Sequence, residues 1–223
     1  MQRRRSRELL DDDRGTAAEV QASLRDLAWI HRRLGGRRIG RSLLRQALAG
    51  VPPRQPLTLL DVGAGAGDLT AYLTAWLRRD HPIRAVALDR QRSHLAAGQA
   101  PGLLRVCADG FALPFAEASI DLVTCHLLLH HFDENDVVRL LVEMRRVARH
   151  AVVVSDLKRG FGTLVFLRWL GALRFSRLTR SDAPASVAQA FTTPEMEAIL
   201  CRAGLGGELR SLWPARWGWV LRR

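Results

Sequence analysis

The sequence predicts an α/β fold in which a mainly parallel, doubly wound sheet carries helices on both faces. Between residues 57 and 155, short apolar runs of strand length alternate with stretches of helical periodicity. A glycine-rich turn follows the first apolar run, and turn residues separate the later elements. The 223 residues suit one such domain with an appendage, because a chain of this length buries a large core without disulfides or metal.

Two helices are expected before the sheet begins. Residues 1–15 are charged and are expected to be frayed. Apolar residues from Thr16 to Gly36 fall at helical spacing, and a second helical stretch ends at Gly50. The sequence VPPRQP then breaks the chain. Residues 1–50 are therefore predicted to form a helical cap or lid, and residues 51–223 the main domain.

The alternating region supplies the expected sheet. Its strand candidates are Leu57–Val62, Ile83–Asp89, Leu103–Cys107, Ile120–Cys125 and Ala151–Ser155. Its helix candidates are Asp68–Arg79, Gln91–Ala100 and Asp133–Arg149. Asp133 is placed to cap the last of these helices, with Asp136 at the capping-box position.

A helical insert is expected after the fifth strand, at about residues 157–186. Its apolar core, FGTLVFLRWLGALRF, is short and contains arginines, so it does not suit a membrane span, which needs about 20 apolar residues. A further helix follows, with Thr193 as its expected cap and Pro194 in its first turn. The tail is expected to form two strands on either side of residues 214–216.

The stretch LLDVGAGAGDLT marks the expected ligand site at the end of the first strand. Glycines there let a ligand approach the main chain. A dinucleotide-binding turn has the spacing G-x-G-x-x-G, whereas this one reads G-x-G-x-G. Asp61 and Asp68 flank the glycines, and carboxylates favour a cationic ligand over a pyrophosphate. Asp89 is placed to accept hydrogen bonds from ribose hydroxyls, with a helix cap as its structural alternative.

This stretch resembles motif I of the class I S-adenosylmethionine-dependent methyltransferases. The resemblance continues through VALDR, CADGFALPFAEASIDLVTC, HLLLHHF and LLVEMRRVARHAVVVSDL, and it points to the small-molecule branch that includes ubiquinone and menaquinone methyltransferases. It implies a Rossmann-like sheet of seven strands with an antiparallel last strand. It also implies S-adenosylmethionine as cofactor and S-adenosylhomocysteine as product. One departure is ARHAVVV, where relatives often have a Gly-Gly turn.

The resemblance implies a set of cofactor-binding positions. The glycine loop and its preceding acid would face the methionine part, the end of the second strand the ribose, and the turn after the third strand the adenine. The implied residues are Asp61, Gly63, Ala64, Gly65, Gly67, Asp89, Arg90, Asp109, Gly110, Phe111 and His126.

Three histidines beyond the fourth strand are candidates for a general base. Such a base is needed when the nucleophile is weakly acidic, because the cofactor supplies only the methyl group. His126 directly follows the strand, and His130 and His131 come one turn later. His126 and His130 are the favoured catalytic residues, with packing or loop fixing as the alternative for all three. No metal is expected, because a third ligand is lacking.

The acceptor is expected to be a small aromatic or lipophilic molecule such as a phenol, a quinol, a polyketide-type hydroxyl or a carbon nucleophile. The insert around Phe166, Trp169 and Leu170 and the N-terminal helix with Trp29 and His31 would cover the site. Simple packing on the sheet is the alternative, as is peripheral membrane contact. The layout resembles bacterial methyltransferases of secondary metabolism that act on polyketide-type phenols.

The net charge of +12 makes a nucleic-acid methyltransferase one alternative. Against it, CHLLLH replaces the [Asn/Asp]-Pro-Pro-[Tyr/Phe] segment of such enzymes, and a single tyrosine leaves few aromatic rings for stacking. A cyclase or a cofactor-binding partner protein is another alternative. Three scattered cysteines and a basic N-terminus without an apolar run favour a cytoplasmic location over secretion.

Overall fold

The computed structural model describes residues 2–4, 6, 8–10 and 15–223. Within them, seven strands form one sheet in the order β3-β2-β1-β4-β5-β7-β6. The strands are β1 (Leu57–Val62), β2 (Ile83–Asp89), β3 (Leu104–Cys107), β4 (Ile120–His126), β5 (Ala148–Leu157), β6 (Glu208–Leu212) and β7 (Arg216–Arg222). β7 pairs antiparallel with β5 and β6, and the other pairs are parallel. The predicted doubly wound sheet with an antiparallel last strand is confirmed.

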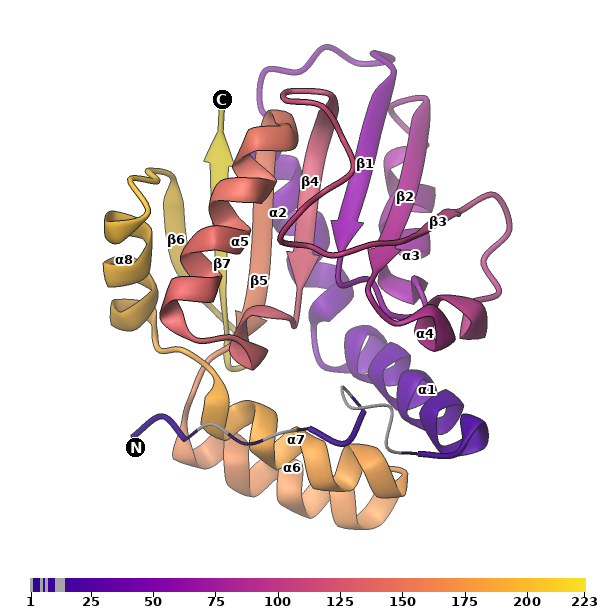
Figure 1. Ribbon diagram of the computed structural model, residues 1–223, viewed down its shortest axis with the longest axis vertical. Coiled ribbons are helices and arrows are strands. Elements are labelled where there is room, and N and C mark those ends of the chain that lie inside the picture. The colour runs from indigo at the N-terminus through magenta and orange to yellow at the C-terminus, as the bar shows by residue number, and fades with distance from the viewer. Residues whose placement is uncertain (1, 5, 7, 11–14) are drawn as a thin grey trace.

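Helices cover both faces of this sheet (Figure 1). On one face lie α5 (Glu134–Val147) and α8 (Thr193–Arg202), and on the other lie α2 (Gly36–Ala47), α3 (Asp68–Leu77) and α4 (Arg92–Ala97). Each face packs into its own apolar core. Burial on both faces explains why the centre of β5 reads as a continuous apolar run and why β4 is buried along its whole length.

Three further helices form a layer at the end of the sheet where the parallel strands finish (Figure 1). They are α1 (Ala17–Arg33), α6 (Phe161–Arg174) and α7 (Arg177–Gln189). The insert expected as one apolar helix is thus two helices, and the second continues through Pro184. Ser23 of α1 and Thr179 of α7 share a buried hydrogen bond of 2.9 Å between their hydroxyls, which joins the layer internally.

Some element boundaries differ from the expected ones for local reasons. Asp133 caps α5 as predicted, accepting from the Asp136 backbone N–H. Thr192, not Thr193, caps α8, because its hydroxyl and the Glu195 carboxylate form a capping box. β5 begins at Ala148, directly after α5, so the ARHAVVV departure adds no loop.

The described part of the N-terminal segment lies along α7 (Figure 1). The Arg4 backbone N–H donates to the Ala188 carbonyl at 3.1 Å. The Leu9 and Leu10 backbone N–H groups donate to the Asp182 carboxylate at 3.1 and 3.0 Å. The expectation of a frayed terminus is therefore wrong for these residues; Met1, Arg5, Arg7 and residues 11–14 lie outside the described residues.

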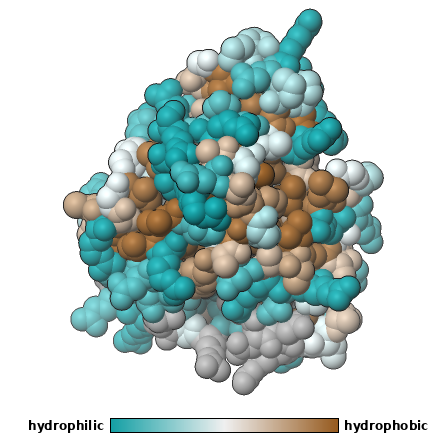
Figure 2. All heavy atoms as spheres, turned by 45° about the horizontal axis from the view of Figure 1, so that its top comes forward, coloured by the Kyte–Doolittle hydropathy of each residue, from teal (hydrophilic) through white to brown (hydrophobic). Residues whose placement is uncertain are grey.

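The surface mixes hydrophilic side chains with apolar ones, as the face in Figure 2 shows. Several arginines stack on aromatic rings, including Arg37 on Tyr72 and Arg45 on Trp76. Part of the arginine excess therefore has a structural use within the fold.

Candidate functional site

A cavity of about 1410 Å³ opens at the carboxyl ends of the parallel strands. Its walls include the loop after β1, the ends of β2, β3 and β4, and the start of β7. The helices α1, α2, α6 and α7 also contribute side chains, so one space joins the sheet to the helical layer. This volume exceeds that of many ligand pockets, about 300–1,000 Å³, and can hold a cofactor together with an acceptor.

The glycine loop forms one wall of the cavity. Gly63 and Gly67 have φ angles of +71° and +78°, and a Cβ at either would lie 2.7 Å from a leucine methyl group. The Gly63 and Ala64 backbone N–H groups donate to the Leu88 carbonyl at 2.8 and 3.0 Å. The loop is thereby held against β2, with Ala64 and Gly65 among the residues that line the cavity.

Asp89 lies at the end of β2, where the ribose contact is expected. Its carboxylate accepts from the Gly65 and Gln91 backbone N–H groups, each at 2.8 Å. Asp89 and Arg90 both line the cavity. Each carboxylate oxygen of Asp89 keeps a second lone pair, so it can accept from a ligand hydroxyl while it fixes the loop.

Asp61 lies behind the glycine loop. It is 3% exposed and, like Gly67, does not line the cavity. Its two oxygens accept from the Thr70 and Thr124 hydroxyls at 2.5 and 2.8 Å. Asp61 is thus held beneath the loop, where it fixes β1 against α3 and places a negative charge under the cavity.

The turn after β3 brings together the three residues expected near an adenine. Asp109, Gly110 and Phe111 all line the cavity. The Phe111 backbone N–H donates to the Asp109 carboxylate at 2.9 Å, which closes the turn. The Phe111 ring meets Phe132 edge-on, with ring centroids 5.1 Å apart.

His126 ends β4 and lines the cavity. Its Nδ1 lies 2.8 Å from the Ser155 hydroxyl, whereas its buried Nε2 has no hydrogen-bond partner among the described residues. Burial lowers the pKa of His126 from its ordinary value of 6.5, although the negative charge of Asp61 opposes the shift. A neutral His126 with Nδ1–H donating to Ser155 presents a lone pair at Nε2.

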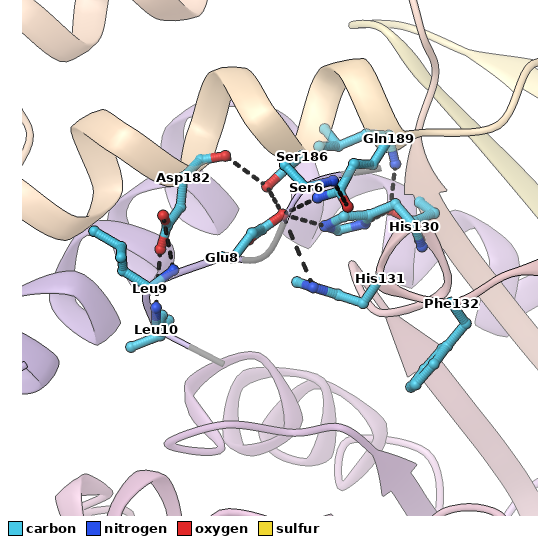
Figure 3. Close-up of polar contacts among 12 residues, drawn as sticks. Ser6, Glu8, Leu9, Leu10, His130, His131, Phe132, Asp182, Ser186 and Gln189 are labelled. Atoms are coloured by element: carbon cyan, nitrogen blue, oxygen red, sulfur yellow. Dashed lines mark hydrogen bonds and ion pairs between the residues drawn. The ribbon is translucent and has the colours of Figure 1, made fainter. Parts of the chain in front are cut away.

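His130 is held between two carboxylates. Its Nδ1 lies 2.7 Å from the buried Asp156 carboxylate, and its Nε2 lies 3.8 Å from Glu8 Oε1. His131 Nδ1 lies 3.8 Å from the same Glu8 atom. Glu8 also accepts from Ser186 at 2.7 Å and from Gln189 at 2.9 Å (Figure 3). Glu8 comes from the N-terminal segment, and no local pattern in the sequence pointed to it.

Glu8, His130 and His131 place potential metal ligands within 4.8 Å of one another. Glu8 is the third ligand that the sequence did not reveal. Its Oε1 already accepts two hydrogen bonds, from Ser186 and Gln189, and Asp156 already holds His130. Hydrogen bonding therefore accounts for the cluster.

Arg216, a residue that the sequence analysis did not single out, gives the cavity a cationic recess. Arg216 is 2% exposed, and its NH1 has no hydrogen-bond partner within the described part of the chain. Burial lowers the pKa of Arg216 to about 10, opposed by the charge of Asp156. His31 Nδ1 and Arg41 Nε are likewise buried without a described partner, and both residues line the cavity. An arginine within the apolar sequence of β7 was the available signal.

Comparison with known proteins agrees with this architecture. Residues 60–154 match the methyltransferase domain family. Demethylmenaquinone methyltransferase of Roseiflexus sp. strain RS-1 is 33% identical over 100 residues, covering 44% of this chain and 41% of that protein. Malonyl-[acyl-carrier protein] O-methyltransferase of Methylococcus capsulatus is 30% identical over 182 residues, covering 75% of this chain and 63% of that protein.

Solved structures show the same fold at low sequence identity. The plantazolicin methyltransferase BpumL gives a TM-score of 0.69 at 11% identity, covering 96% of this chain and 99% of that one. Human N-acetylserotonin methyltransferase gives a TM-score of 0.65 at 15% identity, covering 93% of this chain and 56% of that one. The chain spans less than two thirds of the length of the curated relatives named above. With the strand order and the matched domain, these likenesses place the chain among the class I S-adenosylmethionine-dependent methyltransferases.

Proposed function

We propose that the protein transfers a methyl group from S-adenosylmethionine to an oxygen of a small aromatic or lipophilic acceptor. The observation that carries this proposal is the single cavity. The glycine loop, Asp89 and Asp109 line it, and so do His126 and Arg216; we assign the first group to the cofactor and the second to the acceptor.

The cofactor end suits an adenosine with a charged tail. Asp89 can accept from the ribose hydroxyls, and Asp109 with Phe111 lies beside the space for the adenine. Arg41 lines the same cavity and offers a cation to the methionine carboxylate. When bound there, the sulfonium supplies the methyl group.

The acceptor end combines apolar walls with a few directed polar groups. Leu27, Leu34 and Leu167 line it, and the unpartnered nitrogens of His126 and Arg216 are the polar groups. An acceptor hydroxyl can give its proton to His126 Nε2 while its oxygen attacks the methyl carbon and the carbon–sulfur bond breaks. The Arg216 guanidinium stabilises the negative charge that develops on that oxygen.

The names of similar methyltransferases point to a quinone precursor and to an acyl group carried on a protein. These proteins include methyltransferases named for demethylmenaquinone and for malonyl-[acyl-carrier protein], and BpumL was solved with a desmethylPZN analogue and S-adenosylhomocysteine. The first name favours a lipophilic ring and the second an acidic oxygen. Both chemistries fit an apolar cavity with a cationic recess.

A product assay tests the proposal. The purified protein is incubated with S-adenosylmethionine and, separately, with alkylated phenols, quinols, aliphatic acids and RNA, and S-adenosylhomocysteine is measured. We expect turnover with a lipophilic phenol or quinol. Turnover with RNA alone would instead support a nucleic-acid methyltransferase. Cofactor binding without turnover on any acceptor would support a cyclase or a partner protein.

A further inference from the structure

Helix α6 exposes an apolar stripe on the outside of the end layer. Phe161, Val165, Trp169 and Leu173 follow one another at intervals of four residues, so they share one face of the helix. Their exposed fractions are 74%, 50%, 63% and 68%. Large apolar side chains that are exposed side by side on one element mark an interaction surface. Singly exposed apolar residues, in contrast, are normal on the surface of a protein.

The surroundings of this stripe are basic. Residues 157–181 contain six basic side chains and no acidic one. Arg159 and Arg177 pair with the carboxylates of Glu195 and Glu19. Arg168, Arg174 and Arg180 are exposed and form no ion pair with a described residue. Within the described part of the chain their positive charge has no carboxylate partner, and it is complementary to an anionic surface.

The same helix forms a wall of the cavity. Thr163, Phe166 and Leu167 line the cavity, and Phe166 is also 46% exposed. Trp213, which is 78% exposed, lines the cavity as well. Apolar side chains therefore lead from the outer surface into the acceptor end.

We propose that α6 docks the protein on a membrane surface that contains anionic lipids. A basic helix with aromatic and aliphatic residues on its outer face suits the boundary between headgroups and acyl chains. No helix in the described ranges is long and apolar enough to cross a bilayer. In the proposed docking, α6, which has 14 residues, lies along the interface. Docking on a membrane is an inference separate from the proposed methyl transfer. Only the idea that a lipophilic acceptor enters the cavity past Phe166 rests on the proposed function.

Cosedimentation with vesicles tests the docking. We expect the wild-type protein to sediment with phosphatidylcholine vesicles that contain about a third phosphatidylglycerol, and to remain in solution with phosphatidylcholine alone. Binding should weaken strongly in 0.5 M salt, because surface charges are then screened over about 4 Å. Absence of binding to the anionic vesicles, as for a surface that serves an acidic protein partner, would overturn the proposal.

Two double variants test whether vesicle binding depends on the apolar stripe of α6 or on exposed apolar side chains in general. F161S/L173S removes exposed side chains that do not line the cavity, and we expect it to weaken vesicle binding about tenfold or more. L104S/V142S removes exposed apolar side chains from β3 and α5 and should bind as the wild type does. Equal binding by the two double variants would contradict the assignment to α6.

Variants that remove a positive charge, together with measurements of turnover, complete the test of docking. R168Q should weaken binding to the anionic vesicles several-fold, whereas R78Q, which changes an exposed arginine at the end of α3, should not. F161S/L173S should keep wild-type turnover on a water-soluble phenol and lose turnover on an acceptor presented in vesicles. Vesicle binding without any turnover would refute the proposed function while leaving the docking intact.

Discussion

Arg216 lies at the start of β7, opposite Leu157 of β5, and is enclosed on every side. A buried guanidinium loses its hydration and needs a compensating charge or hydrogen bonds. Asp156 is the neighbouring carboxylate, but its oxygens already accept from His130 and from the Leu157 backbone N–H. The unpartnered NH1 is therefore best explained by an acceptor oxygen that completes its hydrogen bonding.

The variant R216Q tests this role. We expect its KM for the acceptor to rise about 10- to 100-fold, because a hydrogen bond to a charged group contributes roughly 1.5–3 kcal/mol. The dissociation constant of S-adenosylmethionine, measured by calorimetry, should stay near that of the wild type. R222Q, which changes an exposed arginine on the same strand, serves as the control. A weaker cofactor affinity with an unchanged acceptor KM would place Arg216 at the methionine carboxylate instead.

His126 and His130 differ in what they can still do. Asp156 holds His130 through its Nδ1 and its backbone N–H, and the His130 Nε2 lies 3.8 Å from Glu8 Oε1. The buried Nε2 of His126, in contrast, has no hydrogen-bond partner among the described residues. A general base must be deprotonated to act, and the pKa of His126 is lowered by burial. The enzyme should therefore remain active on the acid side of the ordinary histidine range.

The prediction for His126 concerns both rate and pH. H126Q should lower kcat for a phenol about 100-fold or more, with little change in cofactor affinity. In the wild type, kcat should fall only below pH 6.5, the ordinary value from which the pKa of His126 is lowered. H150Q, at a partly exposed histidine outside the cavity, is the control. An unchanged kcat in H126Q would remove the base.

At the scale of elements, the sequence predicted those features that are determined by residues close to one another along the chain. Strand and helix periodicity, the glycine turn and the Asp133 cap depend on neighbouring residues, and each appears where expected within a few positions. The N-terminal segment and Glu8 could not be predicted, because their partners on α7 and beyond β4 are distant in sequence. Arg216 was missed for the same reason, since its burial depends on how β7 packs beside β5.

The N-terminal segment yields a prediction of its own. E8A would leave the buried Gln189 amide without its acceptor, which costs about 1–3 kcal/mol of stability, whereas the Ser186 hydroxyl could still donate to the Asp182 carbonyl at 3.0 Å. We expect faster amide hydrogen exchange at residues 8–10 and along α7, measured by mass spectrometry. E117A, at an exposed glutamate far from this network, should change neither. Equal exchange in E8A and the wild type would show that the segment is held without Glu8.

At the scale of the whole molecule, the cavity is the space where the sheet and the helical layer meet. The sheet contributes the strand ends and their loops, and α1, α6 and α7 close the opposite side. A ligand that contacts both parts adds its binding free energy to the stability of the folded chain, provided that it does not bind the unfolded one. A ligand that stabilises the folded protein therefore identifies the class of molecule that the cavity binds.

Thermal unfolding makes that argument measurable. S-adenosylhomocysteine at about 100 times its dissociation constant should stabilise the protein by about 2.7 kcal/mol, or roughly 5–11 °C in Tm for a chain of this size. NAD should give no comparable shift, because a pyrophosphate at the glycine loop would lie beside the carboxylate of Asp68, which lines the cavity. D89A should lose most of the shift, whereas D80A, at an exposed acid in the turn after α3 and outside the cavity, should keep it. An equal shift with NAD would mean that the acidic loop does not select a cationic ligand.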